Sequence, residues 1–139
     1  MTAKLPEVNI DSLRKLIIDQ ATAFLKEAGE FYPFGAAMDK NDELRPIGIY
    51  WGEEHPDSKE MIDRLSEALW NGIVRGDYKM AAMGIDVYIS DDSSNGKTSA
   101  VEIRVVHHDG KVVRYYLPYK LTSSNDPVYG QIIVEGDEN

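Results

Sequence analysis

An acidic turn is the strongest chemical pattern in the sequence. Residues 91–96 read Asp-Asp-Ser-Ser-Asn-Gly, and Glu102 follows after five further residues. This is the spacing of a calcium-binding loop, in which oxygen ligands converge on the ion, glycine permits the bend and the last acid binds through both oxygens. The flanking segments alternate as strands do, so a polar hairpin loop is favoured and calcium binding is the alternative. The calcium ligands would be Asp91, Ser93, Asn95 and Glu102.

Two further clusters contain histidine. Residues 53–57 read Glu-Glu-His-Pro-Asp and could hold a metal or an acid and a base, but Asp57 is better explained as a helix cap. His107 and His108 point to opposite faces if they lie on a strand, so they cannot share a metal without a bulge. No nucleophile elbow, phosphate-binding glycine loop or zinc-helix motif occurs. We therefore assign no catalytic or cofactor-binding residue and expect no cofactor.

Charged and aromatic residues at strand positions form another group. Asp86 lies in an alternating apolar stretch, and if its face is covered it should have a partner or a raised pKa. We expect that face to be open, because charged residues such as Glu102 are predicted to share it. Tyrosine and arginine are enriched at binding surfaces, although a wet, mixed sheet face is the alternative. The predicted interaction residues are Tyr88, Arg104, Arg114 and Tyr116.

Charge and composition limit the partners. The 139-residue chain has 15 basic and 24 acidic residues, a net charge of −9, and no cysteine. Such a surface repels nucleic acids and anionic membranes, and the lack of thiols excludes disulfides and cysteine-bound metals. The N-terminal residues lack a leader pattern, and no apolar run reaches the roughly 18 residues of a membrane helix. We predict a cytoplasmic protein whose partner is another protein or a second copy of itself.

Two amphipathic helices are predicted. Apolar residues recur at three- and four-residue spacing over residues 10–28, and again over residues 58–75. Residues of types that begin or end helices flank them, namely Asn9 and Gly29 for the first segment and Asp57 and Gly76 for the second. Asp57 also begins a pattern that resembles a capping box.

The remaining segments alternate with the period of strands. Residues 34–38 and 44–51 are predicted to form a hairpin, with Pro46 on an edge strand because proline has no backbone donor. Four strands follow Gly76, the last over residues 128–135.

The turn that ends at Gly110 sets the register of two of these strands. A three-residue loop with a bulge at Gly110 pairs Val101 with Leu117, which makes one face apolar throughout. The same register places Arg104 opposite Arg114 on the other face, a small loss for the pairing.

The predicted fold is a two-layer α+β domain over residues 1–139, in the order α-ββ-α-ββββ. Both helices are expected on one face of a largely antiparallel sheet, and residues 135–139 are expected to fray.

Short segments in the two halves of the chain stand out. Residues 29–35 read GEFYPFG, residues 107–110 read HHDG, and residues 117–119 read LPY. Over residues 29–51 and 84–120, which contain these segments, the chain resembles a family of small uncharacterised bacterial α+β proteins, with a GEFxPFG-type segment and a late strand pair joined by an HxDG-type turn. The resemblance implies a bacterial single-domain protein and transfers no functional residue.

Three functions follow from these patterns. We predict a non-catalytic interaction protein, an immunity- or antitoxin-like partner or a homodimer, that uses its tyrosine- and arginine-bearing sheet face or an edge strand. Calcium binding by the 91–102 loop is one alternative. The other is a small enzyme or ligand-binding protein, which a cleft lined by perturbed titratable groups would favour. Its cleft would lie between helices and sheet, near Glu30, Glu53, His55 and Asp86.

Overall fold

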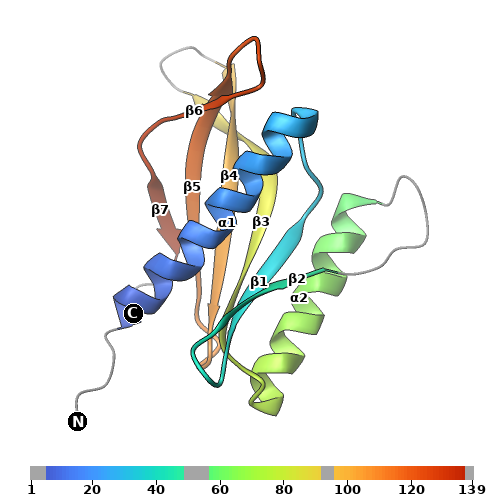
Figure 1. The fold of residues 1–139 in the computed structure, drawn as a ribbon, viewed down its shortest axis with the longest axis vertical. Coiled ribbons are helices and arrows are strands. Elements are labelled where there is room, and N and C mark those ends of the chain that lie inside the picture. The colour runs from blue at the N-terminus through green and yellow to red at the C-terminus, as the bar shows by residue number, and fades with distance from the viewer. Residues whose placement is uncertain (1–5, 49–56, 92–95, 137–139) are drawn as a thin grey trace.

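A computed structural model describes residues 6–48, 57–91 and 96–136, and the side chains of residues 10–48, 57–90 and 96–135 (Figure 1). The α+β class and the predicted order of helices and strands are confirmed, except that the last predicted strand is two short strands. The elements in chain order are α1 (Pro6–Ala28), β1 (Phe34–Asp39), β2 (Leu44–Ile47), α2 (Ser58–Arg75), β3 (Tyr78–Asp91), β4 (Gly96–His107), β5 (Val112–Leu121), β6 (Pro127–Tyr129) and β7 (Ile133–Gly136).

Both helices lie where the apolar spacing predicts them, but the predicted N-terminal cap of α1 is wrong. α1 begins at Pro6, so Asn9 lies inside the helix. Proline suits the first helical position, where a backbone N–H would have no partner within the helix. Asp57 is the N-cap residue of α2, as predicted, but its side chain makes no cap hydrogen bond, so the predicted capping box is not formed. The helix ends are confirmed, because Gly29 and Gly76 adopt left-handed φ angles of 78° and 87°.

The strands pair antiparallel in the order β2-β1-β3-β4-β5-β6, and β7 also pairs with β5. β2 is an edge strand, as Pro46 predicts. Val101 is the partner of Leu117, and Gly110 has a φ of 91°, so the predicted register and left-handed turn residue are confirmed.

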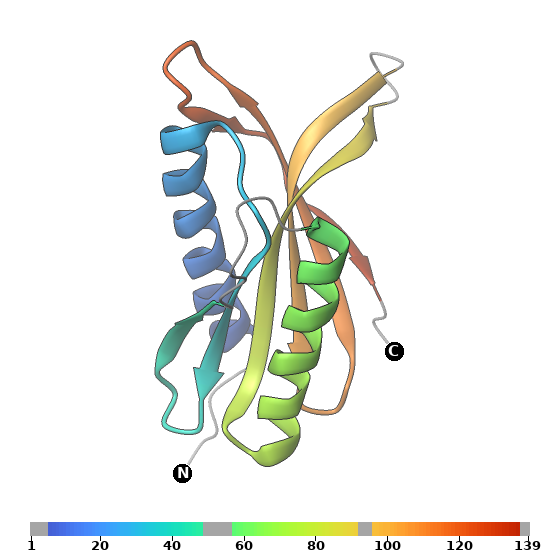
Figure 2. The same cartoon turned by 90° about the vertical axis from the view of Figure 1, so that its right-hand side faces the viewer.

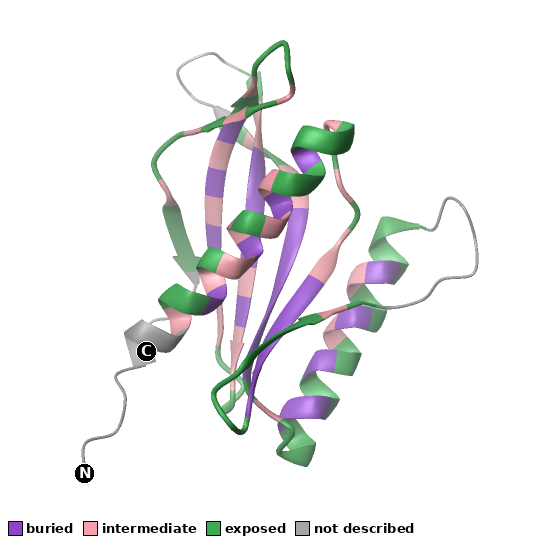
Figure 3. Ribbon diagram, viewed as in Figure 1, coloured by how far each residue is buried: buried purple, intermediate pink, exposed green. Residues whose placement is uncertain are grey.

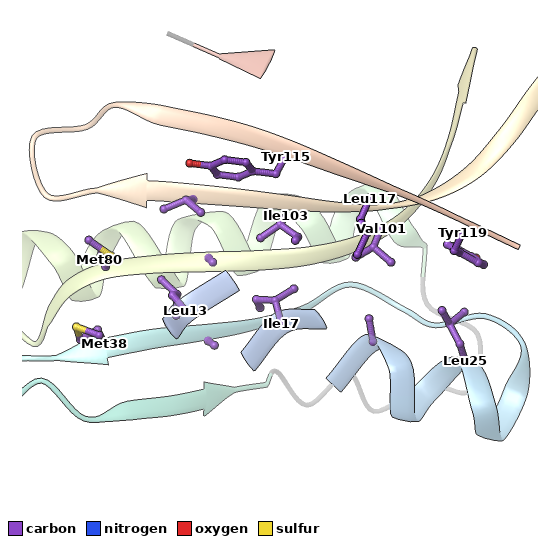
Figure 4. Close-up of a cluster of buried hydrophobic side chains, with 14 residues drawn as sticks. Leu13, Ile17, Leu25, Met38, Met80, Val101, Ile103, Tyr115, Leu117 and Tyr119 are labelled. Carbon is purple, nitrogen blue, oxygen red and sulfur yellow. The ribbon is translucent and has the colours of Figure 1, made fainter. Parts of the chain in front are cut away.

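The two helices cover opposite faces of the sheet, as Figure 2 shows, so the predicted placement of both on one face is wrong. On the α1 face, Ile17 and Leu25 of α1 belong to the same core as Ile103 of β4 (Figure 4). On the α2 face, Leu69 of α2 belongs to a second core with Met83 of β3.

Continuous buried runs explain this three-layer arrangement. All residues from 35 to 39 in β1 and from 80 to 85 in β3 are buried, and Figure 3 shows the runs along both strands. A strand that faces water on one side alternates, whereas a strand covered on both faces is apolar throughout. β1 and β3 therefore lie between the helices, while β4 and β5 are only partly covered on the α2 face.

The C-terminal residues differ from the prediction in one respect. Glu135 and Gly136 pair with β5 as part of β7, so fraying from residue 135 is wrong for these two residues. Residues 137–139 lie outside the described residues. Within residues 6–48, 57–91 and 96–136, neither helix combines the length and the apolar character needed to span a membrane.

Candidate functional site

A cleft of about 770 Å³ opens on the α1 face. It lies between the C-terminal end of α1, the C-terminal ends of β3 and β5, and the N-terminal end of β4. In Figure 2 the C-terminal end of β3 and the N-terminal end of β4 bend away from α1. Small-molecule sites usually measure roughly 300–1,000 Å³, so the cleft has room for an organic ligand. Its polar and aromatic lining includes Glu30, Tyr32, Asp86, Tyr88, Lys97, Ser99 and Tyr119.

Asp86 lies at the centre of the hydrogen bonds in this cleft. The Tyr119 hydroxyl donates to Asp86 Oδ1 at 2.7 Å, and the Phe31 backbone N–H donates a longer bond of 3.4 Å to Asp86 Oδ2. Tyr119 is 5% exposed and lies at the end of the α1-face core near Leu25 (Figure 4). The phenol therefore fixes one carboxylate oxygen, while the other receives a weaker bond.

Burial dominates the titration of this pair. It raises the pKa of the Asp86 carboxyl, and the negative charge of Glu30 adds to the rise, against the two hydrogen bonds, which lower it. Burial also raises the pKa of the Tyr119 hydroxyl, and the hydrogen bond to Asp86 raises it further. At neutral pH the phenol is therefore protonated and donates a hydrogen bond to the carboxylate.

The segment after α1 is held in place by aromatic packing. The Phe31 ring centroid lies 5.5 Å from that of Phe34 and 6.3 Å from that of Phe24, distances at which aromatic rings attract one another. A Cβ at Gly84 would lie 2.6 Å from the Phe34 ring, so glycine on β3 makes room for this cluster. The cluster fixes the backbone that presents Glu30 to the cleft.

The expectation of an open, solvated Asp86 is wrong. Asp86 pairs with Val101 and Ile85 pairs with Glu102, and paired residues on neighbouring strands project to the same face. Asp86 therefore lies on the α1 face and Glu102 on the α2 face. The other outcome that the sequence allows is confirmed, because Asp86 is half-buried with a hydrogen-bond partner and a raised pKa.

Glu102 holds together the charged part of the α2 face. It is 5% exposed, it accepts a hydrogen bond from Arg104 Nε at 2.8 Å, and Arg114 Nε lies 3.5 Å away. The predicted pairing of Arg104 with Arg114 is confirmed. The shared carboxylate, rather than solvent alone, offsets the repulsion between the two guanidinium groups.

The four predicted interaction residues do not share one surface. Tyr88 is 74% exposed and lines the cleft on the α1 face. Arg104, Arg114 and Tyr116 lie on the α2 face, where the Tyr116 hydroxyl donates to Glu135 Oε1 at 3.1 Å. The prediction of one common surface is therefore wrong for Tyr88.

Glu102 does not lie where the predicted calcium loop needs its last ligand. Glu102 pairs with Ile85, six registered pairs from the pairing of Asp91 with Gly96, which is about 20 Å along the strands. Its carboxylate is also bound to Arg104. Ser93 and Asn95 lie outside the described residues, as does the side chain of Asp91.

The histidine clusters are only partly described. Glu53, Glu54 and His55 lie outside the described residues. His107 is half-buried at the end of β4, where burial lowers its pKa, and His108 is exposed in the turn. Across the side chains that the structure describes, no three His, Asp or Glu residues gather as a metal site requires.

The structure brings together two of the four residues predicted for a cleft, Glu30 and Asp86. Sequence reasoning missed Tyr119 and Phe31, which supply the hydrogen bonds to Asp86. A signal existed, because Phe31 lies in the GEFYPFG segment and Tyr119 ends the LPY segment. Two segments far apart in sequence therefore meet at one carboxylate.

Comparisons with protein-family models, curated proteins and solved structures find no match to this chain, so the resemblance to a bacterial family stays a prediction.

Proposed function

We propose that this chain binds a small organic molecule in the cleft around Asp86. The carboxylate of Asp86 is the observation that carries the proposal. It is half-buried, and among the described residues no lysine or arginine forms an ion pair with it. A carboxylate that is partly removed from water without a counter-charge destabilises the fold, and such groups concentrate at functional sites.

The hydrogen bonds around Asp86 suit the binding of a ligand. Burial and Asp86 raise the pKa of the Tyr119 hydroxyl, so the phenol is protonated at neutral pH by a wide margin. A protonated phenol is a hydrogen-bond donor and not a nucleophile. It therefore holds the Asp86 carboxylate in a fixed orientation for a ligand.

A fragment screen by protein-observed NMR tests this function. Chemically diverse fragments are titrated into the isotope-labelled full chain, and the amide of Phe31 serves as the reporter because it bonds to Asp86. We expect bound fragments to shift the amides of residues 29–32, Asp86, Tyr88 and residues 97–99, which line the cleft. Asp86→Asn should weaken the fragments that contact its carboxylate, because it removes the charge while keeping the shape of the side chain.

Asp63→Asn is the matched control, since Asp63 is an exposed acid on α2 that pairs with Lys59. It should leave every fragment affinity unchanged. The proposed function is refuted if no fragment shifts the amides that border the cleft, or if fragments bind only outside it.

A second candidate function is protein docking on the open part of the α2 face. A groove of about 280 Å³ lies there between α2 and the β4–β5 pair, beside the 40% exposed ring of Trp70. Arg104 and Arg114 also line it, and tryptophan and arginine often dominate interface energies. These two guanidinium groups share one buried carboxylate, so the fitting occupant is a peptide segment with an acidic and an apolar side chain.

Selection from a random peptide library displayed on phage tests this second candidate. Selected peptides should place an acid beside an apolar residue, and Arg114→Gln should abolish their binding. Arg75→Gln is the control, because Arg75 ends α2 and pairs with Asp77 away from the groove. Peptides that lack acids, or that bind the Arg114 variant equally well, would exclude this docking mode.

A further inference from the structure

We propose that the ligand of the Asp86 cleft carries a single ammonium group, which it places against Asp86, and a remainder that is neutral or negatively charged. This inference rests on the proposed function, because it names the chemical class of the molecule that the cleft takes.

Two acids, Asp86 and Glu30, line the cleft. Among the described residues, the charged neighbour that raises the pKa of Asp86 is Glu30, so the field at Asp86 opposes a ligand carboxylate and favours a cation. Tyr119 and the Phe31 amide each use one acceptor position on Asp86, and a carboxylate has about four. An ammonium group brings three donors and no acceptor, so it fits the positions that remain.

The walls of the cleft also suit a cation. Tyr32 is 47% exposed and Tyr88 is 74% exposed, and both line the cleft. The face of an aromatic ring attracts an ammonium group placed above it. The net charge of −9 adds a long-range attraction that raises the concentration of cations near the surface.

A lysine beside the cleft limits the ligand to one positive charge. Lys97 lines the cleft, is exposed, and lies on the α1 face because it alternates in phase with Ser99 and Val101 on β4. Its ammonium group repels a second cationic group on the ligand and attracts a carboxylate. A diamine or polyamine therefore fits poorly, whereas a simple amine, or a zwitterion such as an amino acid, fits the acids and Lys97 of the cleft.

A matched series of four probes tests the inference on the full chain. Phenethylamine, phenethyl alcohol, hydrocinnamate and phenylalanine share one aromatic body and differ in charge, and their affinities are measured by NMR titration near neutral pH. We expect phenethylamine and phenylalanine to shift the cleft amides at lower concentration than the alcohol, and hydrocinnamate to bind most weakly. Asp86→Asn should weaken phenethylamine about tenfold or more and leave phenethyl alcohol unchanged.

Glu30→Gln provides a second variant that does not depend on a buried position, because Glu30 is exposed. It should weaken phenethylamine less than Asp86→Asn does, and it should also leave the alcohol unchanged. Equal affinity for the alcohol and the amine at the cleft amides overturns the ammonium inference, while the cleft still binds a small molecule. If neither these probes nor a diverse fragment set shifts any cleft amide, the proposed function itself fails.

Discussion

Two acids on neighbouring strands, Glu102 and Asp86, have contrasting surroundings. Glu102 lies on the α2 face, is 5% exposed, and has the guanidinium groups of Arg104 and Arg114 as neighbours. Asp86 lies on the α1 face, is half-buried, and accepts hydrogen bonds from a phenol and a backbone amide, which are both neutral. One acid has its counter-charge within the chain, and the other has none among the described residues.

This difference separates an acid that holds the fold together from an acid that is available to a ligand. A buried carboxylate with guanidinium partners belongs to a closed network, and its removal leaves those partners uncompensated. A half-buried carboxylate with neutral partners beside a cleft keeps unused acceptor positions and a negative charge. A substitution at Glu102 should therefore change mainly the stability of the fold, and a substitution at Asp86 should change mainly the affinity for a ligand.

The largest expected effect on stability is that of Glu102→Gln. The substitution removes the charge between Arg104 and Arg114, which face each other across β4 and β5. We expect the free energy of unfolding to fall by about 2–3 kcal/mol, less than for a fully buried ion pair because the arginines are partly exposed. Urea denaturation at neutral pH measures the change, and ligand affinity in the Asp86 cleft should be unaffected.

A double-mutant cycle sharpens this prediction. Once Glu102 is neutral, Arg114→Gln should be less harmful than in the wild type, or even stabilising, because it relieves the repulsion from Arg104. A loss below about 0.5 kcal/mol for Glu102→Gln, a value typical of surface changes, would show that solvent compensates both guanidinium groups. Glu102 would then no longer differ from an ordinary surface acid.

An intermediate effect is expected at the tyrosines that bond to acids on each face. Tyr119→Phe removes the 2.7 Å hydrogen bond to Asp86 and should lower the free energy of unfolding by about 1 kcal/mol. Tyr116→Phe removes a bond to the exposed Glu135 and should change it by about 0.5 kcal/mol or less. Thermal denaturation of the two variants compares them directly. A larger loss for Tyr116→Phe would mean that the α2 face, and not the cleft, contains the tighter network.

The sequence predicts much of the fold because local chemistry decides it. The apolar spacing gives both helices, and the turn at Gly110 gives the register of β4 and β5. The placement of the helices on opposite faces was missed, although its signal is local too. Residues 80–83 read Met-Ala-Ala-Met, an unbroken apolar run that indicates a strand covered on both faces.

The candidate site is harder to predict because it depends on long-range packing. Asp86 and Tyr119 lie 33 positions apart, and Asp86 and Phe31 lie 55 positions apart. The alternation of apolar and polar residues shows which side chains of one strand share a face, but it does not show which face of the sheet α1 covers. Because Asp86 was expected to share an open face with Glu102, its burial and its partners could not follow from the sequence.

The smallest expected effect on stability is that of Asp86→Asn, and it depends on pH. Burial raises the pKa of Asp86 above its ordinary value of 3.8, so the folded chain holds this proton more tightly than the unfolded chain does. As pH rises from 3.8 to the raised pKa of the folded chain, the wild type should lose stability relative to the variant. At neutral pH we expect the variant to be as stable as the wild type or slightly more stable.

Urea denaturation of both proteins from acid to neutral pH measures this difference. The other titratable groups that line the cleft, among them Glu30, Tyr88, Lys97 and Tyr119, are present in both proteins, so subtracting the two curves leaves the titration of Asp86. The stability of the wild type minus that of the variant should fall as pH rises. If it rises instead, ionised Asp86 stabilises the fold as Glu102 does. The contrast between the two acids would then disappear. The charge of Asp86 would then give no reason to propose that Asp86 binds a ligand.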